Sequence, residues 1–135
     1  MKMLNKKLGE KGVAAVEFAV ILPFLVLLVL GSIEFGLMFY NKQVITNASR
    51  EGARAGITGK TIAEVQQIVM DYCNNKLINL NGSNNISLGN IVVTPDGLND
   101  LSVAVSFDYN FLFSKIIGLD KVTLSGRTVM RMEPA

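Results

Sequence analysis

The sequence opens with a short polar segment and then becomes apolar over a long stretch. No charged residue lies between Phe18 and Ile33, and few polar residues interrupt the wider stretch from Val13 to Tyr40. A helix needs roughly 20 mostly apolar residues to cross the hydrocarbon core of a bilayer, which is about 30 Å thick. The pattern therefore predicts a single membrane-spanning helix, which we assign to residues 13–39.

Beyond this segment the apolar residues fall on one helix face, which predicts that the same helix continues over residues 40–56 outside the membrane. Ala48, Gly52 and Gly56 follow one another at a spacing of four residues. Small residues so placed let another backbone approach closely, so we expect close packing there. Pro23 has no N–H to donate, and a bend is expected in the membrane-spanning part.

A second helix is predicted over residues 61–80, because Thr61 and Glu64 form a capping-box pattern ahead of an apolar stripe. The helix should end in the asparagine-rich loop from Asn79 to Asn85. Cys73 lies on the apolar stripe. We interpret it as a buried structural cysteine, with an intermolecular disulfide as the alternative.

Three strands are predicted over about residues 86–94, 101–110 and 121–132, and the second has the clearest alternation of apolar and polar residues. In the first, the alternation changes phase at Gly89-Asn90, which indicates a bulge or a late start. The apolar segment 111–119 predicts a turn of helix at the end of the sheet. The predicted fold class is α+β: a long membrane-spanning helix continues into a small head with a second helix and a three-stranded antiparallel sheet.

The amino-acid composition excludes several classes of function. The chain has 135 residues, no histidine, one cysteine and a net charge of +2. Without histidine, the Ser-His-Asp and Cys-His catalytic sets and the histidine metal sites are excluded, and the sequence has no phosphate-binding glycine loop. The weak, scattered charge does not favour nucleic acid. We therefore expect a protein that is not an enzyme and that uses no metal or cofactor.

The charges on either side of the apolar segment indicate its orientation. Residues 1–12 carry four lysines and one acidic residue. Positive charge ahead of a membrane helix favours keeping that end in the cytoplasm, although Lys42, Arg50 and Arg54 behind the helix weaken the bias. We expect the basic leader, residues 1–12, to be cytoplasmic and the head, residues 40–135, to lie outside the cytoplasm.

Glu17 stands at the edge of the apolar run. A carboxylate near a bilayer interior is costly and is usually paired or functional; the alternative is that Glu17 only marks the membrane edge and reaches water. Gly12 lies five residues before Glu17, directly ahead of the apolar segment. This spacing resembles the processing site of type IV prepilins. The resemblance implies cleavage between Gly12 and Val13 by a prepilin peptidase.

A second block makes the resemblance more specific. Leu22-Pro23, the segment Ile33–Gly36 and the segment Thr46–Ala55 are similar to the TadE-like family, the minor pilins or pseudopilins of the tight-adherence (Flp) type IV pilus. The similarity extends from Gly12 to Gly56, and Phe18 departs from the glutamate-tyrosine pair of the major Flp pilin. The resemblance implies a minor component whose partners are other minor pilins, the major Flp pilin and the polytopic assembly platform of the inner membrane.

A physical argument supports an assembly role for Glu17. Cleavage would free an α-amino group on Val13, about 6 Å from Glu17 along the helix axis. A neighbouring subunit raised by about one turn would bring its own amino group against Glu17. The two charges would then neutralise each other, and the pair would select the stagger between subunits without adding much net stability.

Four charged residues further along are candidates for partner docking. Glu34 either lies at the outer membrane–water boundary or pairs with a basic residue of a neighbouring subunit. Glu51 and Arg54 are spaced for an ion pair that leaves Arg50 free. This group is either a solvated helix face or a surface for head packing or partner docking.

The sequence therefore predicts a structural or priming subunit for assembly of a tight-adherence pilus, single-pass in the bacterial inner membrane. It does not decide whether the subunit enters the filament. Two alternatives remain open. One is an uncleaved, signal-anchored membrane protein with a binding head. The other is a secreted binding domain with an ordinary signal peptide that is cut ahead of Ser32.

Overall fold

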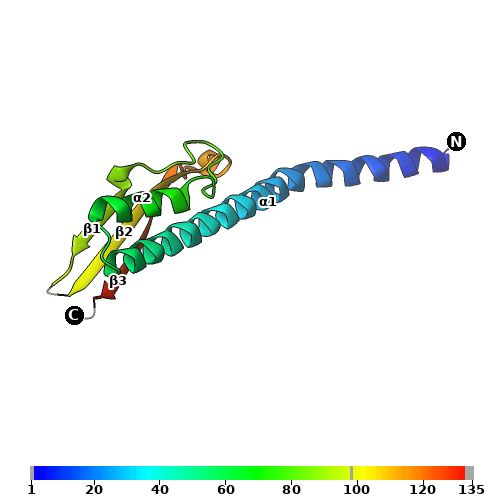
Figure 1. Cartoon of the computed structure of the whole chain (residues 1–135). Helices are drawn as coiled ribbons and strands as arrows, with labels where there is room; N and C mark the ends of the chain where they lie inside the picture. The colour runs from blue at the N-terminus through cyan, green and yellow to red at the C-terminus, as the bar shows by residue number, and fades with distance from the viewer. Residues whose placement is uncertain (1, 98, 133–135) are drawn as a thin grey trace.

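The computed structural model describes residues 2–97 and 99–132, with side chains from residue 12 onward. It consists of a long helix whose first half projects alone and a head packed along its second half (Figure 1). The elements in chain order are helix α1 (Lys2–Ile57), helix α2 (Ile62–Cys73), 3₁₀ turn η1 (Leu88–Asn90), strands β1 (Ile91–Pro95) and β2 (Asp100–Asn110), 3₁₀ turn η2 (Ser114–Ile117) and strand β3 (Lys121–Arg131). The predicted α+β class is confirmed.

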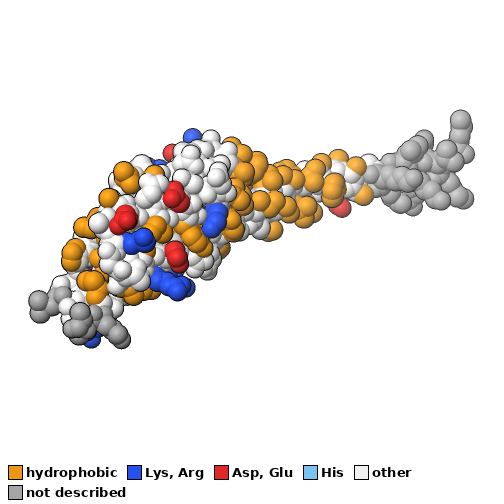
Figure 2. Space-filling view, in the orientation of Figure 1, with side chains coloured by type: hydrophobic (Ala, Val, Ile, Leu, Met, Phe, Trp, Pro, Cys, Tyr) orange, Lys and Arg blue, Asp and Glu red, His pale blue; other side chains and the backbone are white. Residues whose placement is uncertain are grey.

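The projecting half of α1 is apolar and uncovered, and we call its residues 12–33 the stalk. All side chains from residue 12 to residue 29 are exposed, and hydrophobic side chains cover most of the described surface of the stalk that is visible in Figure 2. The most apolar window of α1 has a mean hydropathy of 2.8 with none of it buried, which makes α1 a candidate membrane span. The helix continues through Pro23 and changes direction only gently (Figure 1).

The three strands form an antiparallel sheet in the order β1-β2-β3. Val105 of β2 lies opposite Ile91 on one side and Gly126 on the other. Strands β2 and β3 agree with their predicted ranges to within one residue at each end. The strong alternation in β2 explains this agreement, because a shift of one residue would turn its whole apolar face away from the core.

The core lies between one face of the sheet and the two helices. Helix α1 packs against β2, β3 and α2, and α2 also contacts β1, so both helices cover the same face (Figure 1). The alternate residues of β2 are buried there as predicted, and they are Leu101, Val103, Val105, Phe107 and Tyr109. From α1, Ile45 and Ala48 are wholly buried. The head thus obtains part of its core from the helix that carries the stalk.

The second helix starts as predicted but ends earlier. The Thr61 hydroxyl accepts from the Glu64 amide at 3.3 Å, and the Glu64 carboxylate accepts from the Thr61 amide at 2.8 Å, which is the capping box. The predicted range 61–80 is wrong at its end, because α2 stops at Cys73. Asn75 has a left-handed φ of 65°, and the chain beyond it turns back toward α1 instead of continuing the helix.

The first strand starts late, one of the two outcomes that its changing alternation indicated. It begins at Ile91 instead of residue 86, after the short turn η1. Asn90 causes the delay, since its side-chain oxygen accepts from the amide and the hydroxyl of Ser87 at 3.0 and 2.8 Å. These local bonds favour a turn over a strand.

The row of small residues on α1 packs inside the head. A Cβ atom added to Gly52 would lie 2.5 Å from Cγ2 of Val69 on α2, and one added to Gly56 would overlap the side chain of Leu101 on β2. Ala48 in the same row is wholly buried. Its neighbours are side chains of this same chain, not the approaching backbone that the spacing predicted. The close backbone approach occurs instead at Gly126 of β3.

Candidate functional site

The junction of stalk and head is built around a buried carboxylate. Glu34 is 0% exposed. Its Oε1 accepts the amides of Leu112 and Phe113, the second at 2.8 Å, and its Oε2 accepts the amide and hydroxyl of Ser114 at 2.7 and 2.6 Å. All four donors belong to the segment that enters η2. The carboxylate therefore fastens this segment to the end of the stalk.

The geometry of a helical turn explains why the segment that enters η2 needs an acceptor for its amides. The first amides of any helical turn have no partner within it, and buried amides without a partner are costly. Glu34 supplies the missing acceptors from α1. At the other end, Gly118 has a left-handed φ of 89°, and its amide donates to the Lys115 carbonyl oxygen at 3.0 Å, which ends the turn.

Neither interpretation of Glu34 from the sequence included these bonds. Donors of its own chain surround the carboxylate, so it needs no cation of another subunit, while its place at the outer membrane–water boundary stays a prediction. Sequence reasoning missed the contact because about 80 residues separate the partners, and no local pattern joins them. The only signal was an acidic residue inside an otherwise apolar helix face, which requires some partner.

A second polar contact ties α1 to the loop after α2. Asn41 is wholly buried, its side-chain nitrogen donates to the Ile78 carbonyl oxygen at 2.6 Å, and its side-chain oxygen accepts the Ile78 amide at 2.9 Å. The side-chain amide of Asn41 thus bonds to both the N–H and the C=O of Ile78, as the backbone of a neighbouring strand would. The backbone leaves helical geometry at Asn74 and Asn75, and this contact then holds the following loop against α1.

The residues proposed for processing and assembly lie on the free stalk. Gly12, Val13 and Glu17 are all exposed on the helix surface, away from the head. A Cβ atom added to Gly12 would find no neighbour within 4 Å. Residues 12 and 13 and the Glu17 side chain therefore face the surroundings of the stalk, and the peptide bond between Gly12 and Val13 lies within the helix.

The charged group further along α1 is also exposed. Arg50, Glu51 and Arg54 are all exposed on the part of the helix that passes the head. Within the described part of the chain, Glu51 forms no salt bridge with Arg54, although their spacing would allow one. These side chains therefore do not pack into the head, and docking of a partner on this surface stays a prediction.

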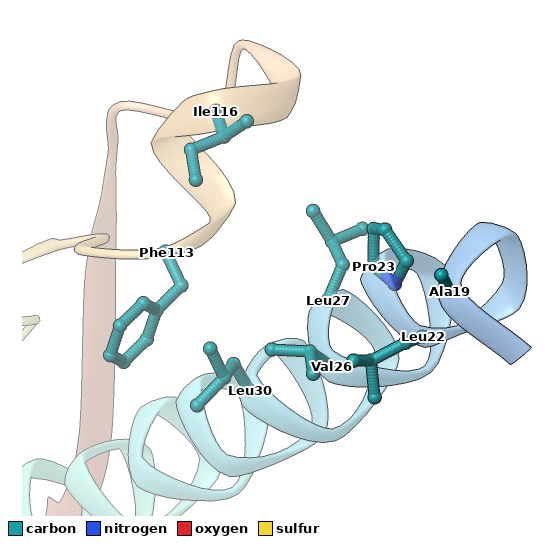
Figure 3. Close-up of a pocket in the computed structure, with 8 residues that line it drawn as sticks. All are labelled: Ala19, Leu22, Pro23, Val26, Leu27, Leu30, Phe113 and Ile116. Carbon is teal, nitrogen blue, oxygen red and sulfur yellow. The ribbon is translucent and has the colours of Figure 1, made fainter. Parts of the chain in front are cut away.

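An apolar hollow of about 480 Å³ lies where η2 overhangs the stalk. Figure 3 shows Phe113 and Ile116 on the η2 side facing Leu27 and Leu30 on the helix side. The remaining lining residues are also apolar and come from α1: Ala19, Leu22, Pro23 and Val26. The hollow therefore offers no polar side chain to a ligand and is continuous with the surface of the stalk.

Cys73 is wholly buried, as predicted for a structural cysteine. Burial raises the pKa of its thiol from 9.0 to about 11. Because the thiolate is the reactive form, the folded head keeps this residue unreactive near neutral pH. A disulfide to another chain would require the head to open.

The stalk and its junction together define a class of protein. One exposed apolar helix, long enough to cross a bilayer and running on into a small α+β head, is the architecture of a membrane-anchored, pilin-like protein. The TadE-like protein family model matches residues 12–54, which comprise the stalk and most of the remainder of α1. This segment is therefore similar to the TadE-like family, as its motifs predicted. No curated protein and no solved structure matches the chain.

Proposed function

We propose that this protein is a minor pilin or pseudopilin that acts as a structural or priming subunit in assembly of a tight-adherence pilus. The observation that carries the proposal is the bare apolar stalk, which bears the TadE-like match and projects from a complete head. A head that already buries its own core can stay folded while the stalk exchanges lipid for the helices of other subunits. The role is structural and involves no catalysis.

Processing is the first step of the proposed role. A prepilin peptidase of the inner membrane cuts after Gly12 and removes the basic leader. The position of Gly12 and Val13 on the part of the helix that the head does not cover supports access by the peptidase. The leader is cytoplasmic and the head lies outside the cytoplasm, as the lysines before the stalk favour.

Assembly then uses Glu17. The new amino terminus of Val13 in one subunit pairs with the Glu17 carboxylate of its neighbour, and the pair sets the stagger between stalks. The exposure of Glu17, far from the head, supports a role toward other subunits. Its partners in this scheme are other minor pilins, the major Flp pilin and the polytopic assembly platform.

The intact mass of the protein, isolated from cells that make the whole pilus system, tests the processing step. A chain that starts at Val13 supports the pilin role. A chain that retains its leader supports an uncleaved signal anchor, and a chain that starts at Ser32 supports secretion with an ordinary signal peptide. Either of the last two results would refute the proposal.

The variant Glu17→Ala tests the assembly step. The proposal expects normal cleavage and a folded head but loss of incorporation into the pilus machinery, measured by co-purification with the other minor pilins. Asp71→Ala is the control, because it removes an exposed carboxylate of the head that has no proposed role in docking. Normal incorporation of the Glu17→Ala chain would disprove the charge pairing.

A further inference from the structure

The turn η2 and its flanks expose an unusual amount of apolar surface. Ile116 is 78% exposed and Ile117 60%, and the flanking Leu112 and Leu119 are 42% and 40% exposed. Large aliphatic side chains exposed in a cluster mark a surface that another apolar phase covers. This cluster lies at the end of the head nearest the stalk (Figure 1).

The height of η2 along α1 can be compared with the thickness of a bilayer. From Val13 to Ile33 an α-helix extends about 31 Å, close to the roughly 30 Å of a bilayer core. The outer boundary of the hydrocarbon then lies near Glu34, where the head begins to cover the helix. Phe113 and Ile116 face Leu27 and Leu30 across the hollow (Figure 3). These two leucines precede Glu34 by about 10 and 6 Å of helix rise, on the hydrocarbon side.

A loop can enter hydrocarbon only if its backbone polar groups are bonded within the protein. The loop before η2 meets this requirement through Glu34, which accepts its three consecutive amides. Within and after the turn, the amide of Ile116 donates to the Phe113 carbonyl oxygen at 3.1 Å, and that of Leu119 donates to the Ser114 carbonyl oxygen at 3.1 Å. The buried Glu34 carboxylate thus satisfies the backbone amides that would otherwise oppose insertion of this segment into the hydrocarbon.

Charged groups flank the apolar cluster where headgroups would lie. Lys115 forms an exposed salt bridge with Asp120 at 3.3 Å, and Lys121 lies 3.8 Å from Asp108. A lysine next to inserted aliphatic residues can lay its methylene chain along the apolar surface and keep its ammonium group in the interface. The order of apolar and charged residues across η2 therefore fits a membrane surface.

We infer that η2 is a second membrane contact of this protein: Ile116 and Ile117 insert into the acyl chains of the outer leaflet beside the stalk, and acyl chains fill the hollow. Glu34 is the positioning residue, because it holds η2 against the helix at this depth. The inference rests on the proposed anchoring of the stalk in the membrane. Its consequence is that the head is seated on the bilayer at a fixed height instead of swinging on the end of one helix.

The chain has no tryptophan, so a single introduced tryptophan reports its own surroundings. Ile116→Trp probes η2, Leu25→Trp on the stalk is the control for the bilayer interior, and Val92→Trp on the solvent-facing side of β1 is the control for water. All three positions are more than half exposed, so each should accept the larger ring. Each full chain is reconstituted in phosphatidylcholine vesicles whose acyl chains carry bromine either near the headgroup or near the terminal methyl. Ile117→Trp repeats the measurement at the adjacent position.

The inference expects a shift of the Ile116→Trp emission to shorter wavelength and the greatest loss of emission with bromine near the headgroup, because interfacial side chains insert about 5–10 Å. Leu25→Trp should lose most emission with deep bromine, and Val92→Trp with neither lipid. If both η2 variants behave like Val92→Trp while Leu25→Trp is quenched, the inference is wrong and the anchored stalk stands. If Leu25→Trp is not quenched, the membrane anchor itself fails, and the inference with it. A blue-shifted but unquenched Ile116→Trp would show that protein and not lipid covers η2, which also overturns the lipid assignment.

Discussion

Glu34 shows how one residue can hold two distant parts of a chain together. Burying an ionised carboxylate is costly unless hydrogen bonds replace the lost water. Here four donors from one short segment do so. Bonds to a charged group are stronger than those between neutral groups. Because the donors are mostly backbone amides, the contact restrains the path of the segment more than its side-chain identities.

Replacing Glu34 by glutamine tests this contact at the residue scale. The new NH₂ group cannot accept from the Ser114 amide and hydroxyl, so buried donors lose their partner. We expect the free energy of unfolding of the head to fall by about 2–4 kcal/mol. Thermal unfolding of the full chain in detergent micelles, followed by circular dichroism, measures the loss. Glu51→Gln, on the exposed face of the same helix, should stay within about 0.5 kcal/mol of the parent chain, and equal stability of the two variants would contradict the structural role of Glu34.

Element packing in the head depends on small residues at helix contacts. Gly52 lets α2 approach α1, and Gly126 lets β3 approach it, since a Cβ atom there would lie 3.1 Å from the Ile45 carbonyl oxygen. Sheet and helices can therefore share one thin core. The same closeness makes these contacts intolerant of added atoms, because protein interiors are close-packed.

Gly52→Ala tests the contact between the helices. Its new methyl group would lie 2.5 Å from Val69 Cγ2 and 3.3 Å from Val103 Cγ1, so atoms must shift. Overpacking of this kind costs about 1–3 kcal/mol of unfolding free energy, less the gain in helix propensity. Adding Val69→Ala to Gly52→Ala should cost less than the two single changes summed, in a double-mutant cycle measured by chemical denaturation. Strict additivity would exclude a direct contact between the two positions.

Burial of Cys73 on α2 makes the free energy of unfolding depend on pH. The folded chain keeps the thiol protonated up to a pKa of about 11, while the unfolded chain releases the proton near 9.0. The contribution of this group to stability is therefore complete below pH 9 and is lost as the pH rises toward 11. The difference in unfolding free energy between the parent chain and Cys73→Ala should shrink over this range by up to about 2 kcal/mol. A difference that does not vary with pH would contradict the raised pKa. The other groups that titrate in this range are the same in both chains, so their contributions cancel in the difference.

At the scale of the whole molecule, one helix serves two environments. Its stalk is bare and apolar, while its second half carries the polar and small residues that the head requires. The first half thus suits lipid or other apolar helices, and the second suits water and the sheet. This division allows the head to fold independently of what surrounds the stalk.

Extraction from membranes tests this division. Apolar burial of a spanning helix does not depend on charge, so neither high salt nor alkaline carbonate should release the protein from membranes of its host, whereas detergent should. A variant with Leu25→Asp and Leu28→Asp, two exposed stalk positions, should be poorly retained in the membrane. Immunoblots of soluble and pelleted fractions provide the measurement. Release of the parent chain by salt alone would refute the membrane anchor.

Periodicity predicted much of this architecture. The stalk, the start of α2 at Thr61 and the register of β2 each follow from residues close together in sequence, where local geometry decides. Prediction failed where distant residues compete with local preference. The apolar stripe beyond Cys73 favoured a longer helix, but Asn75 adopts a left-handed φ and the loop beyond it pairs with Asn41 through Ile78. Gly126, which carries no periodic signal of its own, was likewise recognised only from its contact with α1.

The sequence by itself determined that one apolar helix precedes a small α+β head, because hydrophobic period and length are local properties of the chain. It also identified Gly12 and Glu17 as residues of a TadE-like segment. Only the tertiary structure decided what Glu34 bonds to and that η2 overhangs the stalk. Those facts arise from donors and acceptors about 80 residues apart, and only the folded chain brings such groups within hydrogen-bonding distance.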